Sequence, residues 1–218
     1  NNIKFTDFGE ILNIDGFYDI YKKTKINVGI REYEKNFYGK YNDFKKVSDM
    51  NILRNEMFLD AEKEFDLNKQ ENIFFLEAPT GSGKSNVAMN LSFKALKDNI
   101  DLNKIFYIYP YNTLVEQNLK SLKEVFDGHE EIFNKIAVIN SIYPIKMDFV
   151  EMIKDKNEEY TEYYNKAFLN RQFLNYPIIL TTHVSIFDTM FNNSKESILA
   201  FYQLANSILI LDEIQSYK

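Results

Sequence analysis

The sequence that decides the fold reads Ala78-Pro79-Thr80-Gly81-Ser82-Gly83-Lys84-Ser85, between an apolar run at residues 73–76 and a stretch with helical spacing. Glycines and small residues let the backbone curl around a phosphate and point successive N–H groups at it. The start of the following helix adds partial positive charge. We expect Lys84 to reach the β- and γ-phosphates of a nucleotide and the Ser85 hydroxyl to bind Mg²⁺. The other residues of this cradle are Pro79, Thr80, Gly81, Ser82 and Gly83.

The loop departs from the strict phosphate-loop pattern at one position, because Ala78 stands where that pattern begins with glycine. The other interpretation is a glycine-rich turn that binds nothing. A turn of that kind has no reason to follow an apolar strand and lead directly into an amphipathic helix. The setting therefore favours a nucleotide site.

A second motif begins with the apolar run at residues 207–211 and ends with two acids, Asp212 and Glu213. In an open parallel sheet, ligands bind beyond the carboxyl ends of the strands, which would bring Asp212 beside the phosphate loop. Asp212 would hold Mg²⁺, mostly through water, and Glu213 would orient the attacking water and accept its proton. The alternative is a strand that simply ends at the surface, but together with Lys84 the acids indicate a nucleotide-hydrolysing site.

Short apolar runs alternate with helical patterns along most of the chain, which predicts an α/β fold with a mainly parallel sheet covered by helices on both faces. The predicted strands share a core of Ile, Leu, Val or Phe and lie at 73–76, 105–109, 136–139, 178–181 and 208–211. The helices between them are expected at 85–97, 113–126, 184–191 and 196–205. Ser48 or Asp49 would cap an earlier helix.

Two parts of the chain depart from this alternation. Residues 1–46 are aromatic and Lys-rich, and glycines at positions 9, 16, 29 and 39 are expected to break them into short pieces. We interpret them as a flanking segment or linker, and 47–218 as one domain. The charged, Tyr-rich stretch at 144–177 is expected to be a helical insertion.

Composition limits what this chain can do. Its 218 residues carry 26 basic and 32 acidic side chains, a net charge of −6, so attraction of nucleic acid by the whole surface is excluded. With no cysteine, disulfides and thiolate metal sites are excluded as well, which fits a reducing cytoplasm. The apolar runs are far shorter than the about 20 residues of a membrane helix. We expect a cytoplasmic protein with no membrane partner.

Four motifs together resemble superfamily 2 helicases, and they occur in that family's order. Residues 78–85 are similar to the helicase form of the Walker A motif, in which alanine commonly replaces the first glycine. The other three are the run 109–117 (Tyr-Pro-Tyr-Asn-Thr-Leu-Val-Glu-Gln), similar to motif Ia, the Thr181-Thr182-His183 string, and Asp212-Glu213-Ile214-Gln215, similar to a DExx-type Walker B motif. The resemblance implies a RecA-like P-loop domain that uses ATP and Mg²⁺.

Three longer strings resemble more narrowly the CRISPR-associated helicase-nuclease of type I systems: residues 53–58, 176–183 and 212–217. This likeness spans residues 48–218 and implies a motor that moves 3′ to 5′ along single-stranded DNA. In that family an RNA-guided surveillance complex recruits the motor, and an HD nuclease domain degrades the displaced strand. Carried over by position, Gln117, Thr181 and Thr182 would contact the DNA backbone, and Gln215 would relay the state of the γ-phosphate.

The family's later motifs, its second RecA-like domain and its HD nuclease do not occur in these 218 residues. The chain alone is therefore expected to hydrolyse ATP feebly and not to unwind DNA. Two other interpretations remain: another superfamily 2 translocase or an RNA helicase, and a nucleotide-binding interaction module without motor activity. Taken singly, the short motifs also fit roles without function. His183 would then be a strand-end residue, and Arg54 and Glu56 would lie on a solvated helix face.

Overall fold

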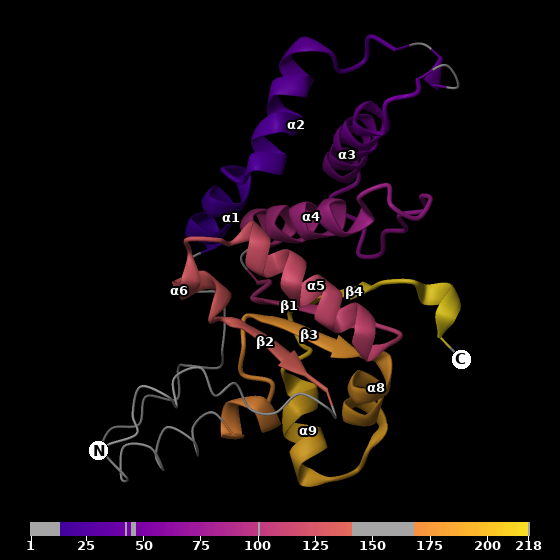
Figure 1. Ribbon diagram of the computed structural model, residues 1–218. Helices are drawn as coiled ribbons and strands as arrows, with labels where there is room; N and C mark the ends of the chain where they lie inside the picture. The colour runs from indigo at the N-terminus through magenta and orange to yellow at the C-terminus, as the bar shows by residue number, and fades with distance from the viewer. Residues whose placement is uncertain (1–13, 42, 45–46, 100, 141–167, 218) are drawn as a thin grey trace. The chain divides into compact units, whose positions relative to one another are not determined.

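A computed structural model describes residues 14–217, except 42, 45–46, 100 and 141–167 (Figure 1). The chain divides into two compact units, Ile14–Asp98 and, among the described residues, 99–217. The second unit holds the sheet and the first holds the phosphate loop.

Four parallel strands form the sheet of the second unit, in the order β2-β3-β1-β4. The strands are β1 (Lys104–Tyr109), β2 (Ile136–Ile139), β3 (Ile178–Thr182) and β4 (Ser207–Leu211). The inner strands β1 and β3 are buried along their whole length, as continuous apolar runs predict for a sheet covered on both faces. The edge strand β4 is only partly covered, and Leu209 and Leu211 are 43% and 44% exposed.

Helices cover both faces of this sheet (Figure 1). The first is α5 (Asn112–Val125), which contacts β1 and β3. On the other face lie α8 (His183–Phe191) and α9 (Lys195–Tyr202), whose Ile186 and Ala200 pack with Phe106 and Ile179 of the strands. The short helices α6 (Glu130–Phe133) and η2 (Ile214–Ser216) also belong to this unit. The predicted parallel α/β architecture is confirmed.

The described part of the first unit holds four α-helices, the last of which follows the phosphate loop. They are α1 (Ile14–Lys22), α2 (Lys25–Asn36), α3 (Met50–Leu67) and α4 (Lys84–Asp98). Phe93 of α4 is fully buried, and its ring centroid lies 5.3 Å from that of Tyr21. A second cluster joins Phe58 and Leu59 of α3 to Val87 of α4. Asp49 caps α3 by accepting a hydrogen bond from the Asn51 N–H, as predicted.

Charged side chains tie the same helices together. Glu62 of α3 lies 2.7 Å from Arg31 and 3.4 Å from Lys94. Burial acts to raise the pKa of Glu62, but Arg31 and Lys94 outweigh it and hold the pKa below its ordinary value. The stabilisation is therefore present above the unfolded carboxyl's pKa of about 4.3, and it is lost as the pH falls through the lower folded value.

Two expectations about this unit are wrong. Residues 73–76 are not a strand, and Ile73 and Phe75 are 75% and 88% exposed. A strand needs a neighbour with open backbone groups, and in the described structure β1–β4 pair only with one another. The second concerns Gly16 and Gly29, which lie inside α1 and α2 instead of interrupting them.

The physical reason for the second difference is burial. Glycine inside a helix costs about 1 kcal/mol relative to alanine. The buried rings of Phe17 and Tyr21 on α1 and of Tyr33 on α2 outweigh that cost.

The predicted insertion at 144–177 lies outside the described residues up to position 167, and residues 168–172 are helical. No helix within the described ranges is long and apolar enough to cross a membrane.

Candidate active site

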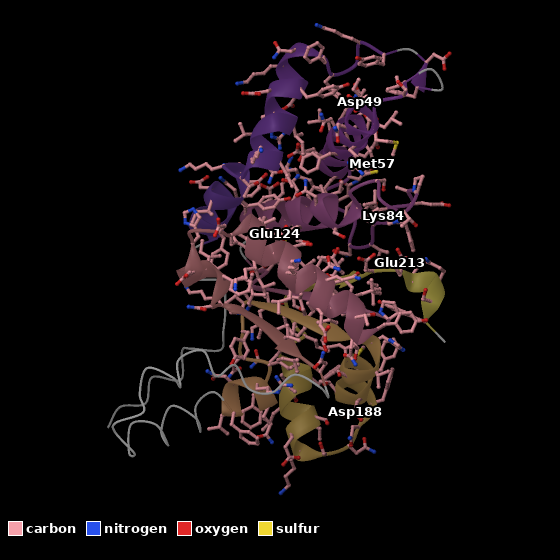
Figure 2. All side chains as sticks on the ribbon, viewed as in Figure 1. Asp49, Met57, Lys84, Glu124, Asp188 and Glu213 are labelled. Carbon is pink, nitrogen blue, oxygen red and sulfur yellow. The ribbon has the colours of Figure 1, made fainter. Side chains whose placement is uncertain are left out.

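The phosphate loop occupies the turn immediately before α4, and Figure 2 shows Lys84 at the start of that helix. Gly81 and Gly83 have φ values of +78° and +94°, a region that residues with a Cβ rarely adopt. The Ser82 N–H donates to the Pro79 carbonyl oxygen at 3.2 Å, which closes the turn. The two predicted cradle glycines are thus the positions where the backbone requires glycine.

Lys84 contacts the loop that precedes it. Its Nζ donates to the Ala78 carbonyl oxygen at 2.7 Å and reaches the Pro79 carbonyl oxygen at 3.5 Å. The half-buried ammonium therefore lies against the backbone that would surround a phosphate. Ser85 follows in the first turn of α4 with its side chain exposed, free to serve as a metal ligand.

The Ser82 side chain supports the fit of a phosphate to this loop. Its residue is 8% exposed, and its Oγ is buried without a hydrogen-bond partner in the described structure. A buried hydroxyl normally finds a partner, so an unpartnered one next to a helix N-terminus is a candidate ligand contact. The loop thus offers one ammonium, the hydroxyls of Thr80, Ser82 and Ser85, and the N–H groups at the start of α4.

The carboxylate pair follows β4 directly. The Asp212 N–H donates to the Ile108 carbonyl oxygen at 3.0 Å, which extends the pairing of β4 with β1 by one residue. One carboxylate oxygen of Asp212 accepts from the Glu213 N–H at 3.0 Å, and the other lies 3.5 Å from the Tyr107 hydroxyl. Asp212 is therefore held at the carboxyl end of the sheet, as predicted.

Glu213 has a left-handed backbone, with φ of +51°. Its carboxylate accepts a hydrogen bond from the Gln215 side chain. A non-glycine residue in this conformation is unfavourable by about 1–2 kcal/mol, and such strain concentrates at functional sites. The contact puts Gln215 next to the predicted general base, and its role in relaying the γ-phosphate state stays a prediction.

We expect Glu213→Gly to raise the free energy of unfolding by about 1 kcal/mol, because glycine adopts the left-handed conformation without strain. Urea denaturation of the 218-residue chain measures this. Glu213→Ala, which keeps the strain, is the matched control and should give no such gain. Equal stability of the two variants would contradict the claim that Glu213 is strained.

The predicted nucleic-acid residues lie on two elements. Thr181 and Thr182 are the last two residues of β3, and Gln117 belongs to α5, the helix that follows β1. Gln117 is exposed on α5. Thr182 caps α8 by accepting from the Ser185 N–H at 3.4 Å. Thr181 is 2% exposed, and its hydroxyl donates to the Ile139 carbonyl oxygen at 2.6 Å, so this side chain joins two strands. DNA contact by these residues stays a prediction.

Sequence reasoning missed the role of Tyr217. Its hydroxyl donates to the Ile108 carbonyl oxygen at 2.9 Å, the same oxygen that binds the Asp212 N–H. Its ring stacks on His183 with 4.9 Å between centroids. Burial, with a smaller contribution from Asp212, raises the pKa of Tyr217 to about 12. The neutral phenol thus fixes the carboxylate loop to β1 and to the start of α8.

The solvated-face interpretation of residues 54 and 56 also needs correction. Glu56 is 5% exposed and accepts a hydrogen bond from Tyr33 at 2.6 Å. Arg54 is exposed, but its guanidinium contacts the phosphate loop at Gly81. The two residues carry structural contacts that the sequence alone did not reveal.

Lys84 and Asp212 belong to different units of the structure. The convergence of these two side chains on one Mg·ATP therefore stays a prediction. Within each unit, the predicted residues do come together: the loop residues around the start of α4, and the carboxylates at the end of β4.

Comparison with known proteins gives the family. No curated protein matches the chain. Residues 62–218 match the DEAD/DEAH box helicase family, and this range includes the phosphate loop, the Thr-Thr-His string and the carboxylate pair. The chain belongs to the DEAD/DEAH box helicases, superfamily 2 enzymes whose domain has an ATP-binding, helicase-type function.

Proposed function

We propose that this chain is the ATP-binding half of an ATP-dependent translocase that moves along single-stranded DNA and acts in type I CRISPR interference against invading DNA. The observation that carries the ATP part is the phosphate loop. Two left-handed glycines, an unpartnered buried Ser82 hydroxyl and Lys84 all lie at the N-terminus of α4. These groups suit a polyphosphate, because N–H donors and an ammonium bind its anionic oxygens.

The residues also suit the Mg²⁺ that accompanies ATP. Ser85 and Asp212 supply oxygen ligands of the kind that Mg²⁺ prefers. The ion, when bound, would neutralise charge on the phosphate oxygens. Glu213, next to Asp212, would orient the attacking water and take up its proton. Lys84 would stabilise the charge that develops on the transferred phosphoryl group.

The DNA part of the proposal rests on where the strands end. Strands β3, β1 and β4 are neighbours and parallel, so their carboxyl ends lie along one edge of the sheet. Thr182 is the last residue of β3, α5 with Gln117 follows β1, and Asp212 follows β4. Polar, uncharged groups beside the carboxylates would let a strand of nucleic acid respond to the nucleotide. Binding through uncharged polar groups suits a chain with a net charge of −6, because it does not depend on attraction of the nucleic acid by the whole surface.

The CRISPR assignment rests on the strings at 53–58, 176–183 and 212–217, which resemble the type I helicase-nuclease. In this proposal a second RecA-like domain completes the ATP site, an HD nuclease degrades the displaced strand, and an RNA-guided surveillance complex recruits the motor. The protein would act in the cytoplasm.

One experiment separates a DNA-binding motor from an RNA-binding one. The chain, with Mg²⁺ and a non-hydrolysable ATP analogue, is titrated into labelled single-stranded DNA, RNA of the same sequence, and duplex DNA. We expect the tightest binding to single-stranded DNA, and weaker binding of the Gln117→Ala variant. Preference for RNA would instead support the RNA-helicase alternative.

The CRISPR role needs a test in cells that contain the guide-RNA complex and a matching plasmid. The gene is supplied either as wild type or with Glu213→Gln. We expect plasmid loss with the wild type and plasmid retention with the variant. Plasmid loss that is unchanged by Glu213→Gln would mean that nucleotide hydrolysis is not needed, and would favour an interaction module.

A further inference from the structure

Arg54 of α3 makes a direct contact with the phosphate loop. Its Nε donates to the Gly81 carbonyl oxygen at 2.9 Å, and its Nη1 donates to the Asn51 side-chain oxygen at 3.2 Å. Arg54 lies 27 residues before Gly81, so this is a tertiary contact and not part of the local turn. The motif roles above do not use this residue.

The contact matters because of how a phosphate loop must be built. Its N–H groups have to face the ligand, so its carbonyl oxygens face away and need other donors. Lys84 binds the Ala78 carbonyl, the Ser82 N–H binds the Pro79 carbonyl, and the Val87 N–H binds the Gly83 carbonyl. Those donors all come from the loop and its own helix. The Gly81 carbonyl is instead held by a side chain from another helix.

Gly81 is also a position where the loop needs help to keep its shape. Its φ of +78° is one that glycine adopts freely among many others, and nothing lies within 4 Å of where a Cβ would be. Packing around this position therefore does not restrain the backbone. A charged donor on the Gly81 carbonyl does restrain it, and charge-assisted hydrogen bonds are stronger than neutral ones.

The helix that carries Arg54 is anchored to the helix that carries the loop. Phe58 and Leu59, one turn further along α3, pack against Val87 of α4. Glu56 accepts from the Tyr33 hydroxyl and fixes α3 to α2. These contacts hold α3 in place, and the Asn51 side chain orients the guanidinium of Arg54. Arg54 therefore binds the Gly81 carbonyl from a fixed position.

We infer that Arg54 is a positioning residue for the nucleotide: it holds the Gly81 peptide so that the phosphate loop keeps its binding shape. This inference rests on the proposed ATP-binding function. Arg54 acts through the backbone and not on the terminal phosphate, so its removal should weaken binding of ADP and ATP by the same factor.

The test compares Arg54→Ala with wild type in titrations of the 218-residue chain with fluorescent ADP and with a fluorescent non-hydrolysable ATP analogue. We expect about a tenfold loss of affinity for both nucleotides. The thermal midpoint of the nucleotide-free chain should stay within about 2 °C of wild type, because Arg54 is exposed. Asn51→Ala, which removes no charge, should lose about threefold through misorientation of Arg54.

Lys63→Ala is the matched control, since Lys63 is an exposed cation on the same helix with no loop contact among the described residues. Unchanged affinity of Arg54→Ala would overturn the inference. So would a loss confined to the ATP analogue, which would mean direct contact with the γ-phosphate, or a large fall in the thermal midpoint. Failure of the wild type itself to bind either nucleotide would overturn the proposed function as well.

Discussion

Lys84→Ala is expected to lower the affinity for ATP by about a hundredfold or more. Lys84 is the one cation of the loop sequence, and an ammonium on the β- and γ-phosphates makes charge-assisted bonds in a partly dehydrated site. In the structure its Nζ binds the Ala78 carbonyl at 2.7 Å, so ATP must exchange a backbone oxygen for phosphate oxygens. The affinity is measured by calorimetric titration with ATP and Mg²⁺.

Lys97→Ala provides the control for that variant, because Lys97 is an exposed cation at the last turn of the same helix. It should bind ATP like the wild type. Both variants should remain folded, since neither side chain belongs to the buried core. Equal ATP affinity of Lys84→Ala and wild type would contradict the assignment of this loop as the nucleotide site.

Gly83→Ala is expected to weaken ATP binding by about tenfold or more, and the reason is conformational. No atom lies within 4 Å of the position that the new methyl group would occupy, so the substitution causes no clash. The cost comes from a φ of +94°, which a residue with a Cβ adopts only with strain. The variant loop relaxes to another shape, and nucleotide binding must then restore the strained one.

Gly29→Ala is the matched comparison. Gly29 also has open space around its Cβ position, but it lies inside α2 and has no positive φ. Alanine should there raise the free energy of unfolding by about 1 kcal/mol and leave ATP affinity unchanged. If Gly83→Ala bound ATP as tightly as Gly29→Ala, the loop would not need its left-handed glycine.

The sequence was a good guide to elements whose patterns are strong and local. The continuous apolar runs at 105–109 and 178–181 predicted β1 and β3, because strands buried on both faces need apolar side chains at every position. The run at 208–211 predicted β4 as well, although this edge strand is only partly covered. The same property misled at 73–76, where an apolar run has no strand partner among the described residues. An apolar run indicates that a segment tends to be buried, but it does not indicate which strand the segment would pair with.

The site shows a similar division. The type and order of Lys84, Ser85 and Asp212 are visible in the sequence because their chemistry is tied to fixed spacings. The Arg54–Gly81 contact depends on how α3 packs against α4, and no local pattern encodes that packing. The left-handed backbone of Glu213 was likewise not visible in the sequence, because glutamate has no intrinsic preference for that conformation.

The central claim is that Lys84 and Asp212 act on one Mg·ATP. The most direct test measures the affinity for ATP of the wild type and of Asp212→Asn. Each protein is measured once with saturating Mg²⁺ and once with a chelator that removes Mg²⁺. If the site is shared, Mg²⁺ should tighten ATP binding to the wild type by about tenfold or more. Asp212→Asn should abolish this gain and leave the ATP affinity without metal unchanged. The same Mg²⁺ gain in Asp212→Asn would show that the carboxylate does not meet the nucleotide held by Lys84, and would contradict the account.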